Sequence, residues 1–316
     1  MPIVRIATRS AHHTGPGSRR ATAYEKFKVL SVTGGIPRYL EDINPGQPAE
    51  NNIRKLCFTP GGFLINEFNL IFSDIFLRNS EDYRLITAAL ASGAKETEEI
   101  QKLLQRRTAG SLPTYLRELE LAGFISRDYS WSLRTGAAAK RSRFRLRDNY
   151  LRFYLKYIQA HRDQIERGTY ELLSLGSLPE WPAIMGLQFE NLVLNSRRAL
   201  HEILRIDPHD VLNENPYFQR KNKKRPGCQI DYLIQTRFGS LYVCEIRFSK
   251  DPVGASVISE VKNKIAALKL PKGISHRRVL IHVNGVTSDV VDSHYFAAIV
   301  DAGTLLRPAK VQPLLL

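Results

Sequence analysis

The stretch QIDYLIQTRFGSLYVCEIRFSK, residues 229–250, decides the fold of the C-terminal part of the chain. Its two apolar runs on either side of a turn predict two strands joined in a hairpin. One strand carries Asp231 and the other carries Glu245. Two carboxylates on neighbouring strands can bind Mg²⁺, because Mg²⁺ prefers oxygen ligands. An ordinary exposed hairpin has the same residue types, so both interpretations stand.

The surroundings of Glu245 favour a functional site. Glu245 lies between Cys244 and Ile246 in an apolar strand, where a carboxylate is unfavourable without a partner or an ion. Strand side chains alternate, so Arg247 lies on the same face as Glu245. Arginine keeps its proton and can hold a phosphate, but it is poorly suited to managing a water molecule. Lys250 would face the other side of a regular strand unless a bulge turns it.

The segments around the hairpin predict a mixed α/β core. Residues 178–200 form a helix that carries Glu190, which could also be an ordinary exposed residue, and residues 215–224 form a polar, basic connection. An amphipathic helix at 255–271 presents Glu260 and Lys262 on a solvated face. A strand at 277–285 and a closing helix, or helix and strand, at 293–306 follow. The order α-β-β-α-β is typical of a layered α/β domain.

Residues 80–146 predict three helices and a two-stranded hairpin. Gly123 is placed to end the third helix. This order is that of a winged helix-turn-helix, whose third helix enters a major groove while its wing lies beside the backbone. The alternatives are a helical bundle with a hairpin and no role in DNA binding, and a winged helix that serves as a protein-contact module. Two basic runs supply the candidate nucleic-acid-binding residues, which are Lys140, Arg141, Arg143, Arg145, Lys221, Lys223 and Lys224.

The charge of the whole chain favours a polyanionic partner. There are 46 Lys and Arg residues against 31 Asp and Glu residues, a net charge of +15. Nucleic acid, with DNA first, is the partner that such a balance indicates, although solubility alone also explains a basic chain. We find no bilayer-spanning apolar run and no secretory signal, so we expect a cytoplasmic protein without a membrane partner. Three scattered cysteines predict neither a disulfide framework nor a zinc site.

The hairpin resembles the PD-(D/E)xK nuclease superfamily. The resemblance implies that Asp231 and Glu245 bind the metal, Mg²⁺, and that Glu190 in QFEN matches the acid of the first helix. Arg247 stands where the family has lysine, which is a departure from its pattern. Two outcomes follow: a metal-dependent nuclease with a weakened site, or a nuclease fold that binds without cutting.

A wider resemblance covers about residues 24–300. GGIPRYL, the winged helix, RDNYLRFYLKYI, GLQFEN and VCEIRFSK resemble the C-terminal region of archaeal and bacterial AAA-type ATPases of the DEXX-box kind, which end in a DUF234-type, nuclease-like domain. The implied fold class is multidomain α+β. Its parts are a disordered tail (1–22), a helical remnant of the ATPase lid (23–79), the winged helix (80–146), a helical connector (147–178) and the PD-(D/E)xK nuclease-like domain (179–310).

The chain has no G-x-x-x-x-G-K-[ST] motif, so no nucleotide site and no ATPase activity of its own are expected. The chain would then be a prokaryotic ATPase remnant without catalytic activity. It would bind DNA, or a separate P-loop ATPase as its partner.

Overall fold

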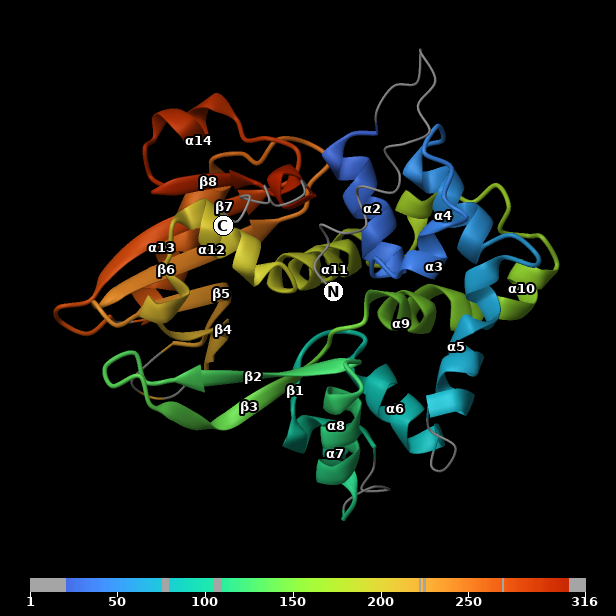
Figure 1. Ribbon diagram of the computed structural model, residues 1–316, viewed down its shortest axis with the longest axis horizontal. Coiled ribbons are helices and arrows are strands. Elements are labelled where there is room, and N and C mark those ends of the chain that lie inside the picture. The colour runs from blue at the N-terminus through green and yellow to red at the C-terminus, as the bar shows by residue number, and fades with distance from the viewer. Residues whose placement is uncertain are drawn as a thin grey trace, which may run out of the picture.

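The computed structural model describes residues 21–75, 80–104, 110–221, 223, 226–268 and 270–306. These residues form a mixed α+β structure with a three-stranded and a five-stranded sheet. In Figure 1 the five-stranded sheet lies to the left, the N-terminal helices lie to the right, and α11 (Trp181–Leu194) runs between them. The segment 1–20, expected to be disordered, lies outside the described residues. Within these residues no helix has the length and hydropathy needed to cross a membrane.

The N-terminal region is helical, as predicted. α2 (Ala23–Thr33) ends where Gly34 takes a left-handed φ of 63° and donates its amide to the Leu30 carbonyl at 2.9 Å. Glycine tolerates this conformation because it has no Cβ atom. Pro37 is the first residue of the next helix, so the Gly-Gly-x-Pro sequence makes the expected turn. The helices that follow are α3 (Pro37–Leu40), α4 (Ala49–Cys57) and α5 (Phe63–Ile75).

Three helices and a hairpin follow in the expected order. Gly123, with a φ of 82°, lies just beyond the third helix, as predicted. A short strand was not expected from the sequence: Lys95 pairs with Phe144, giving a sheet of order β1-β3-β2. The elements are α6 (Ser80–Leu90), β1 (Lys95–Glu96), α7 (Thr97–Leu103), α8 (Leu112–Leu121), β2 (Ile125–Trp131) and β3 (Ala138–Leu146).

An aromatic connector joins this hairpin to α11. It consists of α9 (Asn149–Phe153), a π-helical turn (Tyr154–Ile158), a 3-10 turn (Gln159–His161) and α10 (Arg162–Glu166). Its aromatic stripe is core, as expected: Tyr150, Phe153, Tyr154 and Tyr157 are all buried. Tyr154 stacks on Phe68 of α5 with ring centroids 4.2 Å apart. This packing fixes the connector against the N-terminal helices.

The C-terminal sheet has the order β4-β5-β6-β7-β8. Strands β4 to β6 are antiparallel, and β6 to β8 are parallel, so α13 (Ser256–Leu268) makes the crossover from β6 to β7. The prediction of a connection at 215–224 is wrong in its first part, because Val211–Gln219 is the edge strand β4. The other elements are α12 (Arg197–Leu204), β5 (Cys228–Thr236), β6 (Ser240–Arg247), β7 (Ser275–His282), α14 (Ser288–Asp292) and β8 (Ala298–Asp301), followed by a 3-10 helix (Ala302–Leu306).

Helices cover both faces of this sheet. Tyr232 and Cys244 pack with Phe189 of α11, whereas Val243 packs with Leu268 of α13 on the other face. The result is a three-layer arrangement of helix, sheet and helix. Alternation along β6 places Glu245 on the face covered by α13.

Candidate active site

The five-stranded sheet opens at the two predicted carboxylates. The β5–β6 ladder runs only from Gln235–Leu241 to Tyr232–Cys244, although β5 continues pairing with β4 and β6 continues pairing with β7. Beyond the ladder, the Ile246 amide donates to Asp231 Oδ2 at 2.9 Å. The Asp231 side chain thus replaces a backbone partner at the opening. Strand separation leaves space at Asp231 and Glu245 for further side chains.

Lys264 of α13 fills that space. Its Nζ lies 2.6 Å from Glu245 Oε2 and 3.3 Å from Asp231 Oδ1, and it donates a hydrogen bond to each. Burial lowers the pKa of Lys264, but the two carboxylates outweigh burial and raise it overall. Lys264 is therefore an ammonium ion at neutral pH. It supplies a lysine beside the carboxylate pair, from a helix rather than from strand β6.

The sequence contains a signal for Lys264 that strand alternation alone did not reveal. Val257, Val261 and Leu268 are the buried residues of α13, and Lys264 continues their spacing of three and four residues. A lysine within the apolar stripe of an amphipathic helix needs a partner, since its charge faces the core. Here the partners are Asp231 and Glu245.

Arg247 lies on the Glu245 face, as the alternation predicts. Its Nη2 is 2.6 Å from Glu245 Oε1, and it also pairs with Glu260 of α13. The contact with Glu245 is an ion pair that lacks hydrogen-bond geometry, because Oε1 is buried and has no hydrogen-bond donor among the described residues. Glu260 itself is exposed, in agreement with the solvated face expected for it. Lys250 is exposed and stays outside this cluster.

Glu190 approaches the cluster from α11. Burial is the main cause that raises the pKa of its carboxyl group to about 8, and the negative charge of Asp231 adds to it. The same two causes raise the pKa of Glu245, which is 1% exposed, although Lys264 and Arg247 oppose them. Both shifts arise first from burial and second from repulsion by Asp231, and nearby cations oppose both. Glu190 is half-buried rather than an ordinary exposed residue.

The donor set fits a hard divalent cation with few protein ligands. Glu245 Oε1 is a buried acceptor without a donor, and both carboxylates of the opening are within reach of one ammonium group. In the described chain, no group of three or more His, Cys, Asp or Glu residues is arranged to hold a metal. Mg²⁺ is commonly held by one or two carboxylates, with water and substrate phosphates completing its shell. Asp231 and Glu245 match that requirement.

The predicted nucleic-acid-binding residues are divided between several environments. Lys140 and Arg141 are exposed on β3, and Lys221 and Lys223 are exposed beyond β4. Lys224 lies outside the described residues. Arg143 is half-buried over the Phe218 ring, and Arg145 is buried.

Part of this basic charge is already neutralised. Glu96 lies 3.9 Å from Arg141, 4.0 Å from Arg143 and 2.7 Å from Arg220. Glu96 is itself 4% exposed, so a buried carboxylate contacts arginines of both basic runs, around residues 140–147 and 219–225. The exposed lysines of both runs keep their charge available at the surface.

Comparisons with known proteins leave the family open. No protein-family model matches the chain. An uncharacterized protein of Methanocaldococcus jannaschii is 25% identical over 188 residues, which are 60% of this chain and 41% of that protein. The chain thus spans less than half the length of this curated relative. The crystal structure of protein VC1899 from Vibrio cholerae aligns with 97% of the chain, and with 59% of its own, at 9% identity and a TM-score of 0.31.

Proposed function

We propose that the chain binds nucleic acid and hydrolyses its phosphodiester bonds in a Mg²⁺-dependent reaction at Asp231, Glu245 and Lys264. One observation supports this proposal most: Lys264 Nζ lies 2.6 Å and 3.3 Å from the carboxylates of Glu245 and Asp231, at an opening of the sheet. The site then holds two acids and a lysine, with the lysine supplied by α13. Arg247 becomes an additional cation instead of a defective replacement.

Each residue has a role that its environment supports. Asp231 and Glu245 would hold Mg²⁺, which lowers the pKa of bound water and stabilises charge on a phosphate under attack. Lys264 is cationic, so it would orient the phosphate and stabilise developing negative charge rather than remove a proton. Arg247 would provide a second phosphate contact. In the reaction, the oxygen of water would bond to phosphorus while the bond to one ester oxygen breaks. The proton that water gives up passes through solvent, and the leaving oxygen takes up a proton and departs as an alcohol.

Delivery of the nucleic acid is assigned to the hairpin unit. We propose that residues 80–146 act as a winged helix, because three helices precede a hairpin with an exposed basic strand. Lys140 and Arg141 are exposed there. Phosphate contacts of this kind fix the register of a strand without selecting its sequence.

A binding protein without catalysis is the second candidate. The same Lys264 contacts favour it, since an ammonium bridging both carboxylates competes with a metal ion for the same oxygens. Arg247 occupies another Glu245 oxygen in the same way. On this account the carboxylates stabilise the opened sheet, and the basic surfaces alone contact nucleic acid.

Cleavage of supercoiled plasmid and of a labelled single strand, with Mg²⁺ or Mn²⁺ and with EDTA, separates the two candidates. We expect metal-dependent cleavage by the wild type and a loss of roughly 100-fold or more in Asp231→Asn and Lys264→Met, since each removes a group that acts on the transition state. Lys262→Met is the matched control, because Lys262 is exposed on the same helix. This variant should cleave at the wild-type rate.

Strand binding without cleavage in the wild type would establish the second candidate. Cleavage that survives Lys264→Met but not Asp231→Asn would remove Lys264 from the mechanism and leave the carboxylates in it.

A further inference from the structure

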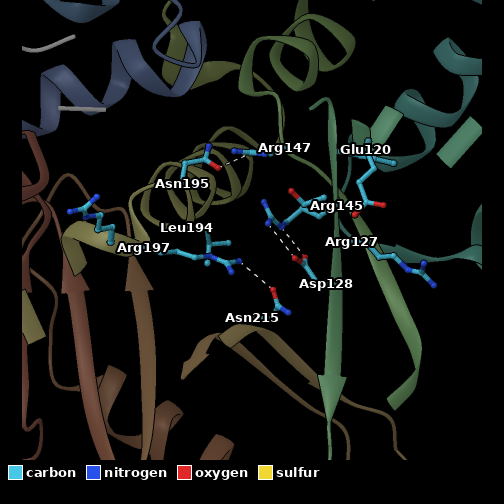
Figure 2. Close-up of a pocket in the computed structure, with 12 residues that line it drawn as sticks. Glu120, Arg127, Asp128, Arg145, Arg147, Leu194, Asn195, Arg197 and Asn215 are labelled. Atoms are coloured by element: carbon cyan, nitrogen blue, oxygen red, sulfur yellow. Dashed lines mark hydrogen bonds and ion pairs between the residues drawn. The ribbon is translucent and has the colours of Figure 1, made fainter. Parts of the chain in front are cut away.

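An arginine-lined cleft lies apart from the carboxylate cluster and includes Arg145, one of the predicted nucleic-acid-binding residues. It has a volume of about 390 Å³ and opens where the β2–β3 hairpin meets the end of α11, the start of α12 and β4 (Figure 2). Its lining includes five arginines, against two acids, Glu120 and Asp128. The arginines are Arg127, Arg145, Arg147, Arg197 and Arg198. Two separate parts of the fold thus place positive charge around one space.

Neutral amides hold three of these arginines in position. Arg147 Nε donates to Asn195 Oδ1 at 3.0 Å, and Arg197 Nη2 donates to Asn215 Oδ1 at 3.3 Å. Arg145 donates to the side chain of Asn191 on α11. An amide oxygen orients a guanidinium group but does not neutralise it. In Figure 2, Arg147 lies beside Asn195, Arg197 beside Asn215, and Arg145 beside Asp128.

Three nearby carboxylates already have partners, one of them Glu202, which lies 3.5 Å from Arg198. Asp128 accepts from Arg145 Nε at 2.9 Å, and both side chains are buried. The acid nearest Arg197 is Glu214, at 3.8 Å, which also accepts from Tyr232. Because these carboxylates are paired, the positive charge of other arginines in the cleft is not neutralised by them.

Arg147 is the clearest case of unbalanced charge. It has no carboxylate within ion-pair distance in the part of the chain that the structure describes. Partial burial of its guanidinium group lowers the pKa of Arg147 first, and repulsion from Arg145 and Arg197 lowers it further. A bound anion would relieve that repulsion.

The guanidinium groups of the lining fit a phosphate. Guanidinium groups bind phosphate with paired hydrogen bonds in a planar geometry. The apolar lining residues are Ile125 and Leu194, so the cleft offers little surface for an aromatic or aliphatic ligand. Its volume is within the range of ligand sites and admits a phosphate with part of a sugar.

The cleft also adjoins the helix that carries Glu190. Asn191, the next residue, contacts Arg145. Burial and Asp231 raise the pKa of Glu190, and the charge of Arg145 opposes them, so Arg145 acts on both places. A strand held in the cleft would therefore lie near the C-terminal end of α11.

We propose that the arginine cleft is a phosphate-binding site, and that a nucleic-acid strand is the source of the phosphates. For its ligand class this inference rests on the proposed function, but it does not depend on cleavage. The exposed wing is a separate contact surface with different residues.

The test is the double variant Arg147→Gln/Arg198→Gln, since both residues are exposed and their replacement spares the buried Arg145. Arg167→Gln/Arg237→Gln is the matched control, because it removes two exposed arginines outside the cleft. Binding of a fluorescein-labelled single strand is followed by anisotropy in EDTA over a range of salt concentrations. Calorimetry with tripolyphosphate forms the second arm.

We expect the cleft variant to bind the strand about 10-fold or more weakly, with a shallower salt dependence because fewer phosphates are contacted. The control should match the wild type. Equal loss in the cleft variant and the control would overturn the inference, because charge alone would then explain binding. Tripolyphosphate binding that the cleft variant loses, with strand affinity unchanged, would overturn the strand as the source.

The two proposals can fail separately. A wild type that binds through the cleft but never cleaves would refute the nuclease and keep the phosphate site. Cleavage and binding that are both unaffected in the cleft variant would refute the phosphate site and keep the nuclease.

Discussion

Glu190 is a carboxyl group whose ionisation the fold disfavours. Its folded pKa is about 8, above the usual value for glutamate, because burial and Asp231 penalise the charged form. Below the ordinary pKa of about 4.3 the group is neutral in both folded and unfolded states and has no effect on stability. As pH rises from there towards 8, the unfolded chain releases the proton more readily, so folded stability falls.

Glu190→Gln should remove that loss. We expect the variant to match the wild type near pH 4 and to melt a few degrees higher near pH 9, since 1 kcal/mol shifts the melting temperature of a chain this size by about 2–4 °C. Thermal melts across this pH range measure the difference. Glu166→Gln, at an exposed position, is the control. A variant less stable than the wild type at pH 9 would mean that the ionised carboxylate has a partner.

The residue scale also shows how far the sequence could lead. Asp231, Glu245 and Arg247 were found because neighbouring strands and period-two alternation bring them together, and both are local properties. Lys264 lies 19 residues beyond Glu245 in the sequence, on α13. Only the crossover of α13 over the opened sheet places it beside the carboxylates. Its position in an apolar stripe was visible in the sequence, but the partner was not.

At the scale of elements, β4 was missed because it looks like a loop. Its centre is Asn213-Glu214-Asn215-Pro216, and proline cannot donate to a ladder. A register shift between Asn215 and Tyr217 accommodates the proline at the edge of the sheet. The outer side of β4 contacts β2: the Phe218 amide donates to Ser130 Oγ, and this hydroxyl donates to the Phe218 carbonyl. Such partners come from segments distant in sequence.

The junction of β3, α9 and α11 is a buried polar network. Arg152 is 0% exposed and donates to Gln188 Oε1 and to the Leu146 carbonyl, each at 2.7 Å. Gln188 in turn donates to the Asn149 carbonyl, and Asn149 returns a bond to the Gln188 carbonyl. Burial is the main cause that lowers the pKa of Arg152 to about 9. The hairpin unit and α11 are therefore joined through α9 by buried hydrogen bonds.

Gln188→Leu tests this junction. Leucine has a similar volume but leaves a buried guanidinium and the Asn149 carbonyl each short of one partner, which costs about 1–3 kcal/mol. We expect a lower melting temperature and a lower urea midpoint, whereas Gln159→Leu, at an exposed position, should change neither. Unchanged stability in Gln188→Leu would show that the network is replaceable by apolar packing.

For the whole molecule, two helices belong to both halves. Val29 and Val32 of α2 pack in the core of the N-terminal helices, while Phe27 and Leu30 pack in the core against the sheet. α11 divides in the same way, with Ile184 in the first core and Phe189 in the second. Phe27 and Phe189 meet edge to face with ring centroids 5.0 Å apart. Neither core is complete without these helices, so the two halves should unfold together.

The two tryptophans of the chain allow a direct test. Trp181 packs against the helical core and Trp131 against the sheet, so Trp131→Phe and Trp181→Phe each leave a fluorescent probe of one half. We expect both probes to report one urea midpoint. Phe27→Ala should lower that midpoint for both probes, with a loss of about 3–5 kcal/mol in the free energy of unfolding, as for a fully buried aromatic residue. Leu172→Ala is the control, since Leu172 is 96% exposed. Two separate midpoints, or a Phe27→Ala effect confined to the Trp131 probe, would show that the sheet unit folds independently and that α2 is an accessory to it.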